Sequence, residues 1–164
     1  MEDVFQKLIL MIRAYYPVLY LHSYEYYRTK QKIKGIVELL RREGKKVNYY
    51  QWDCVYGLVQ ILPDKTEIRI ERMQNPLEVL AYILNSKKSG EKNIFVLDDI
   101  NNHIERDEVK LMFRKIAEAT NNNTHAIILS SIYRLPAELE KYITVLQIPL
   151  PKRNELGEVL DIVA

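Results

Sequence analysis

The chain has 164 residues, of which 48% are hydrophobic and 28% are charged. This composition is typical of a globular domain with a hydrophobic core and excludes an intrinsically disordered chain. The length suits one domain, spanning 1–164, rather than two independent ones. With 24 Lys and Arg against 22 Asp and Glu, the net charge of +2 does not predict a surface that coats nucleic acid.

A single cysteine, Cys54, excludes an internal disulfide, and we expect it to be a small buried hydrophobe. Cys54 and the three histidines lack the spacing of zinc ligands, so no metal site is predicted. The N-terminus mixes acidic, basic and apolar residues at helical spacing, unlike a signal peptide, and no apolar run approaches the length of a membrane span. We therefore expect a soluble, cytoplasmic protein.

The first half of the chain alternates helices and strands. An N-terminal helix within 1–16 ends before Pro17, because the residue preceding a proline disfavours the α region. An apolar run at 18–21 predicts a strand buried on both faces. Apolar residues at helical spacing predict a helix over 25–43, with Gly44 as its cap. An aromatic-rich strand is predicted at 47–52.

An exposed β-hairpin insertion is predicted over 57–72, because two strand-like runs flank a Pro-Asp-Lys-Thr turn. Asn75 and Pro76 then give a strong start signal for a helix.

The second half continues the alternation. We predict a strand at 93–98, a helix at 107–119, a strand at 126–129, a short helix opened by Pro136 and a fifth strand at 143–148. A last helical pattern over 156–163 lies within 152–164, which we interpret as the start of a helical subdomain or a linker. The whole order predicts an α/β fold with a five-stranded, mostly parallel sheet flanked by helices and joined by right-handed crossovers.

Two acidic residues follow the third predicted strand. Residues 94–97 are apolar, and Asp98 and Asp99 come directly after them, at the strand end where open α/β sheets bind ligands. This pattern matches the Walker B form, in which the first acid helps to hold Mg²⁺ and the second orients an attacking water. The alternative is a strand that simply ends in a solvated acid or a helix cap.

The glycine-rich loop that holds nucleotide phosphates does not occur in the chain. Such a loop has the form G-x-x-x-x-G-K-[ST], whereas residues 22–27, after the first strand, read His-Ser-Tyr-Glu-Tyr-Tyr. Bulky side chains and an acid there oppose a triphosphate, so we expect no hydrolysis. Ser130 and Ser131 close the fourth strand, either as a polar sensor position of an ATPase or as an ordinary turn.

The chain contains 12 tyrosines, which can serve a core, a protein interface or base stacking. The predicted helix over 25–43 also carries a basic face, which is either its solvated side or a surface for single-stranded nucleic acid; it comprises Lys30, Lys32, Lys34, Arg41 and Arg42. The small net charge favours the solvated side.

The order of elements, with the acidic strand end and the sensor-like strand, resembles the core of an AAA+ ATPase of the P-loop NTPase type. More narrowly, the segments at 12–25, 75–80, 95–99 and 135–139 resemble the N-terminal domain of the uncharacterised AAA-ATPase family found in cyanobacteria, some plastid genomes and other bacteria. In that family, the resemblance implies, a degenerate ATPase-like domain precedes a complete AAA+ module with a phosphate loop.

This sequence departs from an active AAA+ domain in a second respect, because no arginine finger stands between Leu139 and Val145. We therefore expect a non-catalytic regulatory or interaction domain whose protein partner is its own catalytic module or another subunit, with no cofactor. One alternative is a vestigial ATP- or ADP-binding domain that uses Asp98, Asp99 and Ser130, with ATP and Mg²⁺ as ligands. Another is a single-stranded nucleic-acid-binding module. Because the helical pattern runs to Ala164, we also expect a fragment or a truncated paralogue.

Overall fold

A seven-stranded sheet forms the centre of the computed structural model, which describes residues 2–119 and 123–150. The strand order is β4-β3-β2-β5-β6-β1-β7. The strands are β1 (Val18–His22), β2 (Val47–Asp53), β3 (Gly57–Ile61), β4 (Glu67–Glu71), β5 (Lys92–Asp98), β6 (Thr124–Ser130) and β7 (Thr144–Gln147). The strands β2, β5, β6, β1 and β7 are parallel to their neighbours in this group, whereas β3 pairs antiparallel with both β2 and β4.

The prediction of an α/β fold with a parallel sheet is confirmed, but the predicted number of strands is wrong. The five expected parallel strands are present within two residues of their predicted bounds. The hairpin predicted over 57–72 adds β3 and β4 to the same sheet, because β3 pairs with the free edge of β2 from Tyr49 to Asp53. Gly57 permits this tight turn, since its φ is +78° and a Cβ there would lie 2.9 Å from the backbone nitrogen of Met73. β4 is the exposed edge strand, as expected for the insertion, but the exposure predicted for the whole hairpin is wrong for β3, in which Leu58 and Ile61 are buried.

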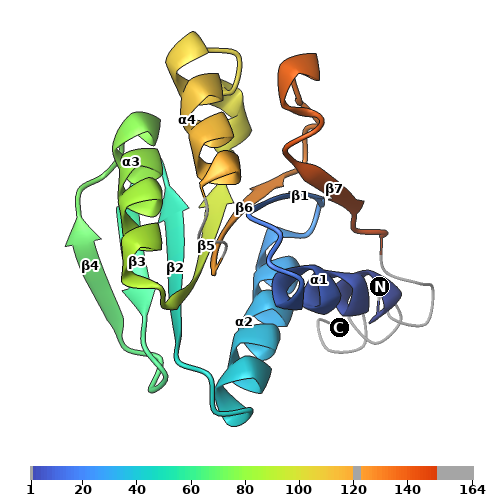
Figure 1. The fold of residues 1–164 in the computed structure, drawn as a ribbon. Helices are drawn as coiled ribbons and strands as arrows, with labels where there is room; N and C mark the ends of the chain where they lie inside the picture. Colours follow the sequence, from blue (N-terminus) through green and yellow to red (C-terminus); the bar gives the residue numbers. More distant parts are fainter. Residues whose placement is uncertain (1, 120–122, 151–164) are drawn as a thin grey trace, which may run out of the picture.

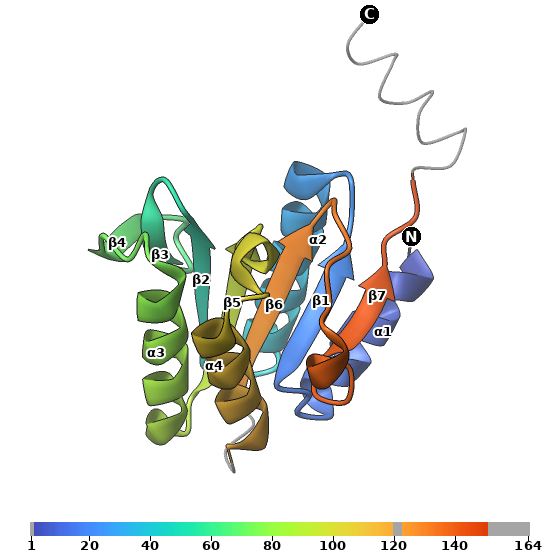
Figure 2. The same cartoon turned by 90° about the horizontal axis from the view of Figure 1, so that it is seen from above.

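Helices cover both faces of the sheet. The helices α1 (Glu2–Arg13) and α2 (Tyr26–Arg42) lie on one face, and α3 (Pro76–Ser86) and α4 (Asp107–Glu118) lie on the other (Figures 1 and 2). Three short 3₁₀ helices complete the described elements: η1 (Lys87–Ser89), η2 (Ile100–His103) and η3 (Ala137–Leu139). In none of the described residues is there a helix both long enough and apolar enough to cross a membrane.

Each face of the sheet has its own hydrophobic core, because successive side chains of a strand point to opposite faces. In β1, Tyr20 belongs to the core under α3 and α4, whereas Leu19 and Leu21 belong to the core under α1 and α2. The side chains of Leu97 in β5 and Ile128 in β6 join the first core. The apolar runs of the parallel strands are therefore explained by burial on both faces.

Local signals in the sequence have mixed outcomes. The start of α3 is as predicted, since the Asn75 side chain accepts a hydrogen bond of 3.0 Å from the backbone nitrogen of Leu77. The expectation that Cys54 is buried is wrong, because it is exposed in the turn between β2 and β3. Asp53 organises that turn by accepting hydrogen bonds from two backbone N–H groups that follow it. The predicted helix at 156–163, within 152–164, lies outside the described residues.

A buried histidine and lysine meet at the amino-terminal edge of the sheet. His125 Nδ1 lies 2.6 Å from the carbonyl oxygen of Tyr16, so this nitrogen carries the proton, and Nε2 accepts from Lys92 Nζ at 2.9 Å. Burial, with the nearby Lys92 charge, lowers the pKa of His125 to about 4. Burial also lowers the pKa of Lys92 to about 8. A proton on His125 would place two cations side by side in the interior.

His125 should therefore make the fold sensitive to acid. Its pKa is about 6.5 in the unfolded chain and about 4 in the folded one, so the unfolded chain binds more protons between these values. The stability from this group is complete above pH 6.5 and falls as the pH drops toward 4, by about 3 kcal/mol in total. Urea denaturation at pH 7.5 and 4.5 measures the loss.

The matched variant is His125→Asn, whose amide can still donate to Tyr16. We expect the variant to be less stable at pH 7.5 and to lose less stability on acidification. If this variant loses as much stability between pH 7.5 and pH 4.5 as the wild type does, groups other than His125 cause the acid sensitivity.

Candidate functional site

The carboxyl ends of four neighbouring parallel strands bring the predicted site residues to one edge of the sheet. β5 ends at Asp98, β6 at Ser130, β1 at His22 and β7 at Gln147, and these strands are adjacent in the sheet. Three residues separate the end of β1 from the start of α2, so the first turns of α2 lie over the same edge. This is the edge at which open α/β sheets bind ligands.

An ion pair occupies the end of β5. Lys30 Nζ, from the second turn of α2, donates to Asp98 Oδ2, and the two side chains are only 21% and 14% exposed. Burial raises the pKa of the Asp98 carboxyl above its ordinary value, and the Lys30 ammonium offsets part of this rise. The other oxygen, Oδ1, is buried and has no hydrogen-bond partner among the described residues. The chain thus supplies its own cation to the first acid of the pair.

The second acid is held by a tyrosine. Tyr26, in the first turn of α2, donates its hydroxyl proton to Asp99 Oδ1 at 2.5 Å and accepts a hydrogen bond of 2.8 Å from the backbone nitrogen of Ser131. Asp99 has a left-handed backbone with φ of 57°, and its N–H donates to the carbonyl oxygen of Leu129 at 2.9 Å. Since Asp tolerates this conformation better than most residues, the type of residue suits the bend after β5.

Ser130, the predicted sensor position, is 1% exposed. The Ser130 hydroxyl accepts a hydrogen bond of 3.1 Å from the backbone nitrogen of Ile132. The Ser130 carbonyl oxygen accepts one of 2.9 Å from the backbone nitrogen of Ser23. These contacts hold the turn after β6 against the end of β1. The structure therefore brings Asp98, Asp99 and Ser130 to one edge, with the Ser130 hydroxyl engaged in the local turn.

The connection from β1 to α2 is short, and hydrogen bonds of Ser23 hold it. Ser23 Oγ lies 2.8 Å from Thr29 Oγ1 and accepts a hydrogen bond of 3.1 Å from the backbone nitrogen of Glu25. Ser23 and Thr29 are both 1% exposed, so this contact is sealed from solvent. These hydrogen bonds hold the connection itself, whereas the N-cap of α2 has no side-chain hydrogen bond.

An exposed aromatic cluster, formed by His22, Tyr24 and Tyr133, lies at the same edge. The ring of His22 is 5.4 Å from that of Tyr24 and 6.3 Å from that of Tyr133, measured between centroids. Tyr24 and Tyr133 are 63% and 50% exposed. Ring packing of this kind prearranges an apolar surface without burying it.

The sequence interpretation missed Tyr26 and Lys30 as site residues and placed Lys30 on a solvated basic face. A signal was present, because positions 26, 30, 33 and 37 follow one stripe of a helix, and Ile33 and Val37 on that stripe are buried. A lysine within an apolar stripe faces the protein and needs a partner there. Of the other basic residues on the predicted face, Arg41 donates to the carbonyl oxygen of Val47 and Arg42 lies 3.7 Å from Glu38.

The fold and its acidic strand end define an AAA-like α/β domain. Residues 4–148 match the model of one family, the SpoVK-like AAA ATPase N-terminal domain, and the chain belongs to that family. The membership predicted from the sequence is thereby confirmed.

Three longer proteins, each named uncharacterized AAA domain-containing protein ycf46, are similar to this chain. Those from Guillardia theta and Trieres chinensis are 28% identical to it, over 92% and 94% of the chain respectively. That from Pyropia yezoensis is 26% identical over 92% of the chain. The matched region covers only 28% to 29% of these relatives, so the chain spans less than a third of their length.

The ion pair at the strand end predicts a specific pattern of stability. Lys30→Met should cost about 2 kcal/mol, because it leaves the mostly buried Asp98 carboxylate without its cation. Adding Asp98→Asn should recover part of this loss, with a coupling energy of about 1 to 2 kcal/mol between the two positions. Urea denaturation of both single variants and the double variant measures the coupling.

Glu108→Gln provides the control, because it breaks an exposed ion pair with Arg106. This change should not measurably alter the urea midpoint. Additive effects of Lys30→Met and Asp98→Asn would contradict an energetically coupled pair.

Proposed function

We propose that this chain is a non-catalytic, ATPase-like regulatory or interaction domain that positions or assembles the catalytic ATPase module of a larger AAA protein. The observation that carries the proposal is the ion pair between Lys30 and Asp98. In a working site, the acid at this strand end is available to a metal ion and its water shell. Here a lysine of the same chain takes that role, and the strand end is stabilised without a ligand.

The residues at this edge do not fit ATP and Mg²⁺. A triphosphate needs a glycine-rich loop that curls backbone N–H groups around it and a lysine directed at its phosphates. Here the β1–α2 connection is short and held by Ser23, which accepts from the backbone nitrogen of Glu25, and Lys30 is paired with Asp98. Asp99, the candidate for orienting water, is held by Tyr26.

The aromatic cluster supports an interaction role at the same edge. Exposed tyrosines are enriched in protein interfaces because their rings supply apolar contact area and their hydroxyls still form hydrogen bonds. The similar proteins are AAA domain-containing proteins more than three times as long as the matched region. Another segment of such a protein could therefore bind this edge of the domain. A strand edge that no longer binds a nucleotide can then serve as a docking surface.

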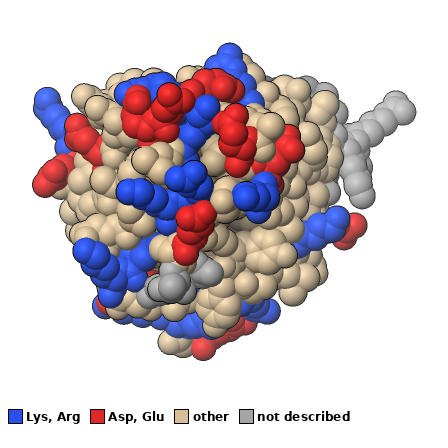
Figure 3. Space-filling view, turned by 45° about the horizontal axis from the view of Figure 1, so that its top comes forward, with Lys and Arg blue, Asp and Glu red and all other residues tan. Residues whose placement is uncertain are grey.

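The charge distribution does not favour the nucleic-acid alternative. Figure 3 shows Lys and Arg intermixed with Asp and Glu on one face of the molecule rather than one wide basic surface. Of the basic residues proposed for that role, Lys30, Arg41 and Arg42 contact groups of the protein itself, and Lys32 also has an interaction within the protein. Phosphate binding along a strand of nucleic acid depends on several free cations in a row.

ATP with Mg²⁺ should neither bind to the strand ends nor be hydrolysed by this chain. Isothermal titration calorimetry and a phosphate-release assay on the wild type and on Asp98→Asn measure both properties. Micromolar ATP affinity that is lost in Asp98→Asn, or turnover above the rate without protein, would overturn the proposal. A rise in melting temperature with ATP or ADP that is lost in Asp98→Ala would instead establish the vestigial nucleotide site.

The aromatic cluster should affect a catalytic module joined to this domain. In a longer AAA protein that contains the domain, Tyr24→Ala with Tyr133→Ala should change the ATPase rate or the assembly state several-fold, as measured by phosphate release and sedimentation. The control is Tyr16→Ala, which removes a ring that is 39% exposed at the opposite edge of the sheet. Equal effects of the double variant and the control would argue against docking through the cluster.

A further inference from the structure

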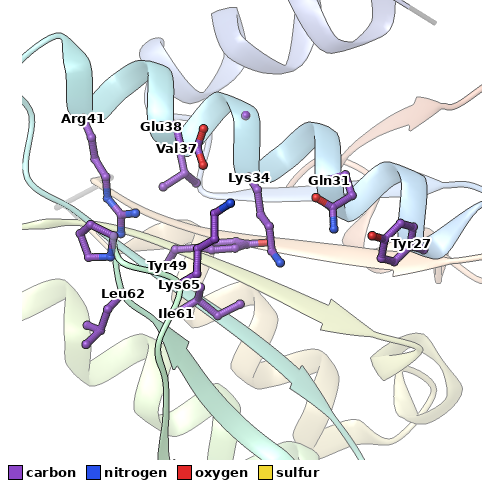
Figure 4. Close-up of a pocket in the computed structure, with 12 residues that line it drawn as sticks. Tyr27, Gln31, Lys34, Val37, Glu38, Arg41, Tyr49, Ile61, Leu62 and Lys65 are labelled. Carbon is purple, nitrogen blue, oxygen red and sulfur yellow. The ribbon is translucent and has the colours of Figure 1, made fainter.

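A cavity of about 390 Å³ lies between α2 and the turn that joins β3 to β4, away from the strand ends. Figure 4 shows side chains from both elements bordering it. Its size falls in the range of sites for small molecules. Asp98, Asp99 and Ser130 do not line it.

The cavity exists because the sheet extends beyond its helices on one face. The chain passes from β2 to β3 and on to β4 through turns, without a crossover helix to cover them. In Figure 2, α1 and α2 lie behind the parallel strands, and no described helix lies behind β3 and β4. The flank of α2 and the inner face of the hairpin therefore enclose a space that the protein leaves open.

Positive charge converges on this space. Lys34 and Arg41 come from α2 and Lys65 comes from the hairpin turn, and Figure 4 shows their side chains reaching into the gap from opposite sides. Neither the Lys34 nor the Lys65 side chain forms an ion pair or hydrogen bond with another described residue. Three cations that share one cavity repel one another, and an anion between them removes this repulsion.

Arg41 is the most firmly placed of the three. Its Nε and Nη2 atoms both donate to the carbonyl oxygen of Val47, at 3.2 and 2.8 Å, which fixes the plane of the guanidinium group. Partial burial also lowers the pKa of Arg41. Glu38 is the one acidic residue among the described residues that line the cavity; it lies 3.7 Å from Arg42, and its charge also acts on Arg41. The cavity thus keeps a net positive charge.

The remaining lining is largely apolar. Tyr49, Ile61 and Val37 are buried and form the floor, whereas Leu62 and Pro63 of the turn border the space from the hairpin. An occupant with an apolar or planar part would bury that part against these side chains. The lining therefore suits an anion that carries an organic group better than a bare inorganic ion.

Gly35 adds an independent indication that the space is kept open. It lies in the middle of α2, where glycine costs about 1 kcal/mol relative to alanine. A Cβ at this position would meet no atom within 4 Å, and the backbone does not have a positive φ. Packing and backbone geometry thus give no reason for glycine here, but a larger side chain would narrow the cavity that Gly35 lines.

We infer that this cavity binds a small organic phosphate of about mononucleotide size. Its phosphate lies between Lys34, Lys65 and Arg41, and its organic part lies against Leu62 and Pro63. The site is separate from the strand ends, and the inference does not depend on the proposed function.

Calorimetric titration of the chain with AMP, adenosine and inorganic phosphate tests the inference. We expect AMP to bind with a dissociation constant of about 0.1 to 1 mM, and adenosine and inorganic phosphate to bind at least about tenfold more weakly. Absence of AMP binding, or equal binding of adenosine, would overturn the inference and leave the proposed function untouched.

Variants locate the ligand. Lys34→Gln with Lys65→Gln should weaken AMP binding at least about tenfold, because both free ammonium groups are lost. Gly35→Leu should also weaken binding by filling the cavity, while the urea midpoint stays equal or rises because leucine favours the helix. Lys7→Gln, which removes one exposed lysine of α1, is the control and should leave AMP affinity unchanged.

Asp98→Asn separates this site from the strand ends. We expect AMP to bind this variant as it binds the wild type. Binding lost in Asp98→Asn and kept in Lys34→Gln with Lys65→Gln would place the nucleotide at the strand ends and contradict both proposals. A short thymidine oligonucleotide that binds more tightly than AMP, with the same loss in the double lysine variant, would overturn the small-molecule inference in favour of nucleic acid.

Discussion

The ion pair between Lys30 and Asp98 is the constraint on which the candidate site depends. It links α2 to the end of β5 across β6, which separates β5 from β1 in the sheet. Two charges that are mostly withdrawn from water are each unfavourable alone, so each side chain requires the other. With Lys30 fixed, the first turn of α2 places Tyr26 on Asp99, and the same turn closes over the strand ends. One contact thus joins α2 to the end of β5 and neutralises the first acid at this edge.

A parallel sheet brings strand ends together whether or not they bind a ligand. Its topology explains why acidic, hydroxyl and aromatic side chains gather at one edge here, but it does not determine their chemistry. That chemistry depends on the side chains in the β1–α2 connection and the first turns of α2. In this chain they contact the acids and one another through the hydrogen bonds of Ser23, Tyr26 and Lys30.

Local patterns predicted the elements well, and pairings between distant segments less well. The cap at Asn75 and the apolar strand before Asp98 depend on neighbouring residues, so the sequence alone was sufficient for them. Whether the hairpin at 57–72 stands apart or joins the sheet depends on the edge of β2 being free, which is a property of the whole topology. Likewise, the partner of Lys30 lies 68 residues away, and only the position of Lys30 in the buried stripe of α2 pointed toward it.

The cations of α2 lie in two different environments, the strand ends and the cavity beside the hairpin. The geometry of the helix keeps these two groups of cations apart. With a rise of 1.5 Å per residue, Lys34 lies about 6 Å and Arg41 about 16 Å further along the axis than Lys30. Lys30 is neutralised by an acid of the sheet, whereas Lys34 faces the space beside the hairpin, where Glu38 is the one acid in the lining. Closing the strand ends with an internal ion pair therefore does not remove the capacity for anion binding from this helix. The unneutralised charge lies on the flank of α2, where the added strands β3 and β4 provide the opposite wall.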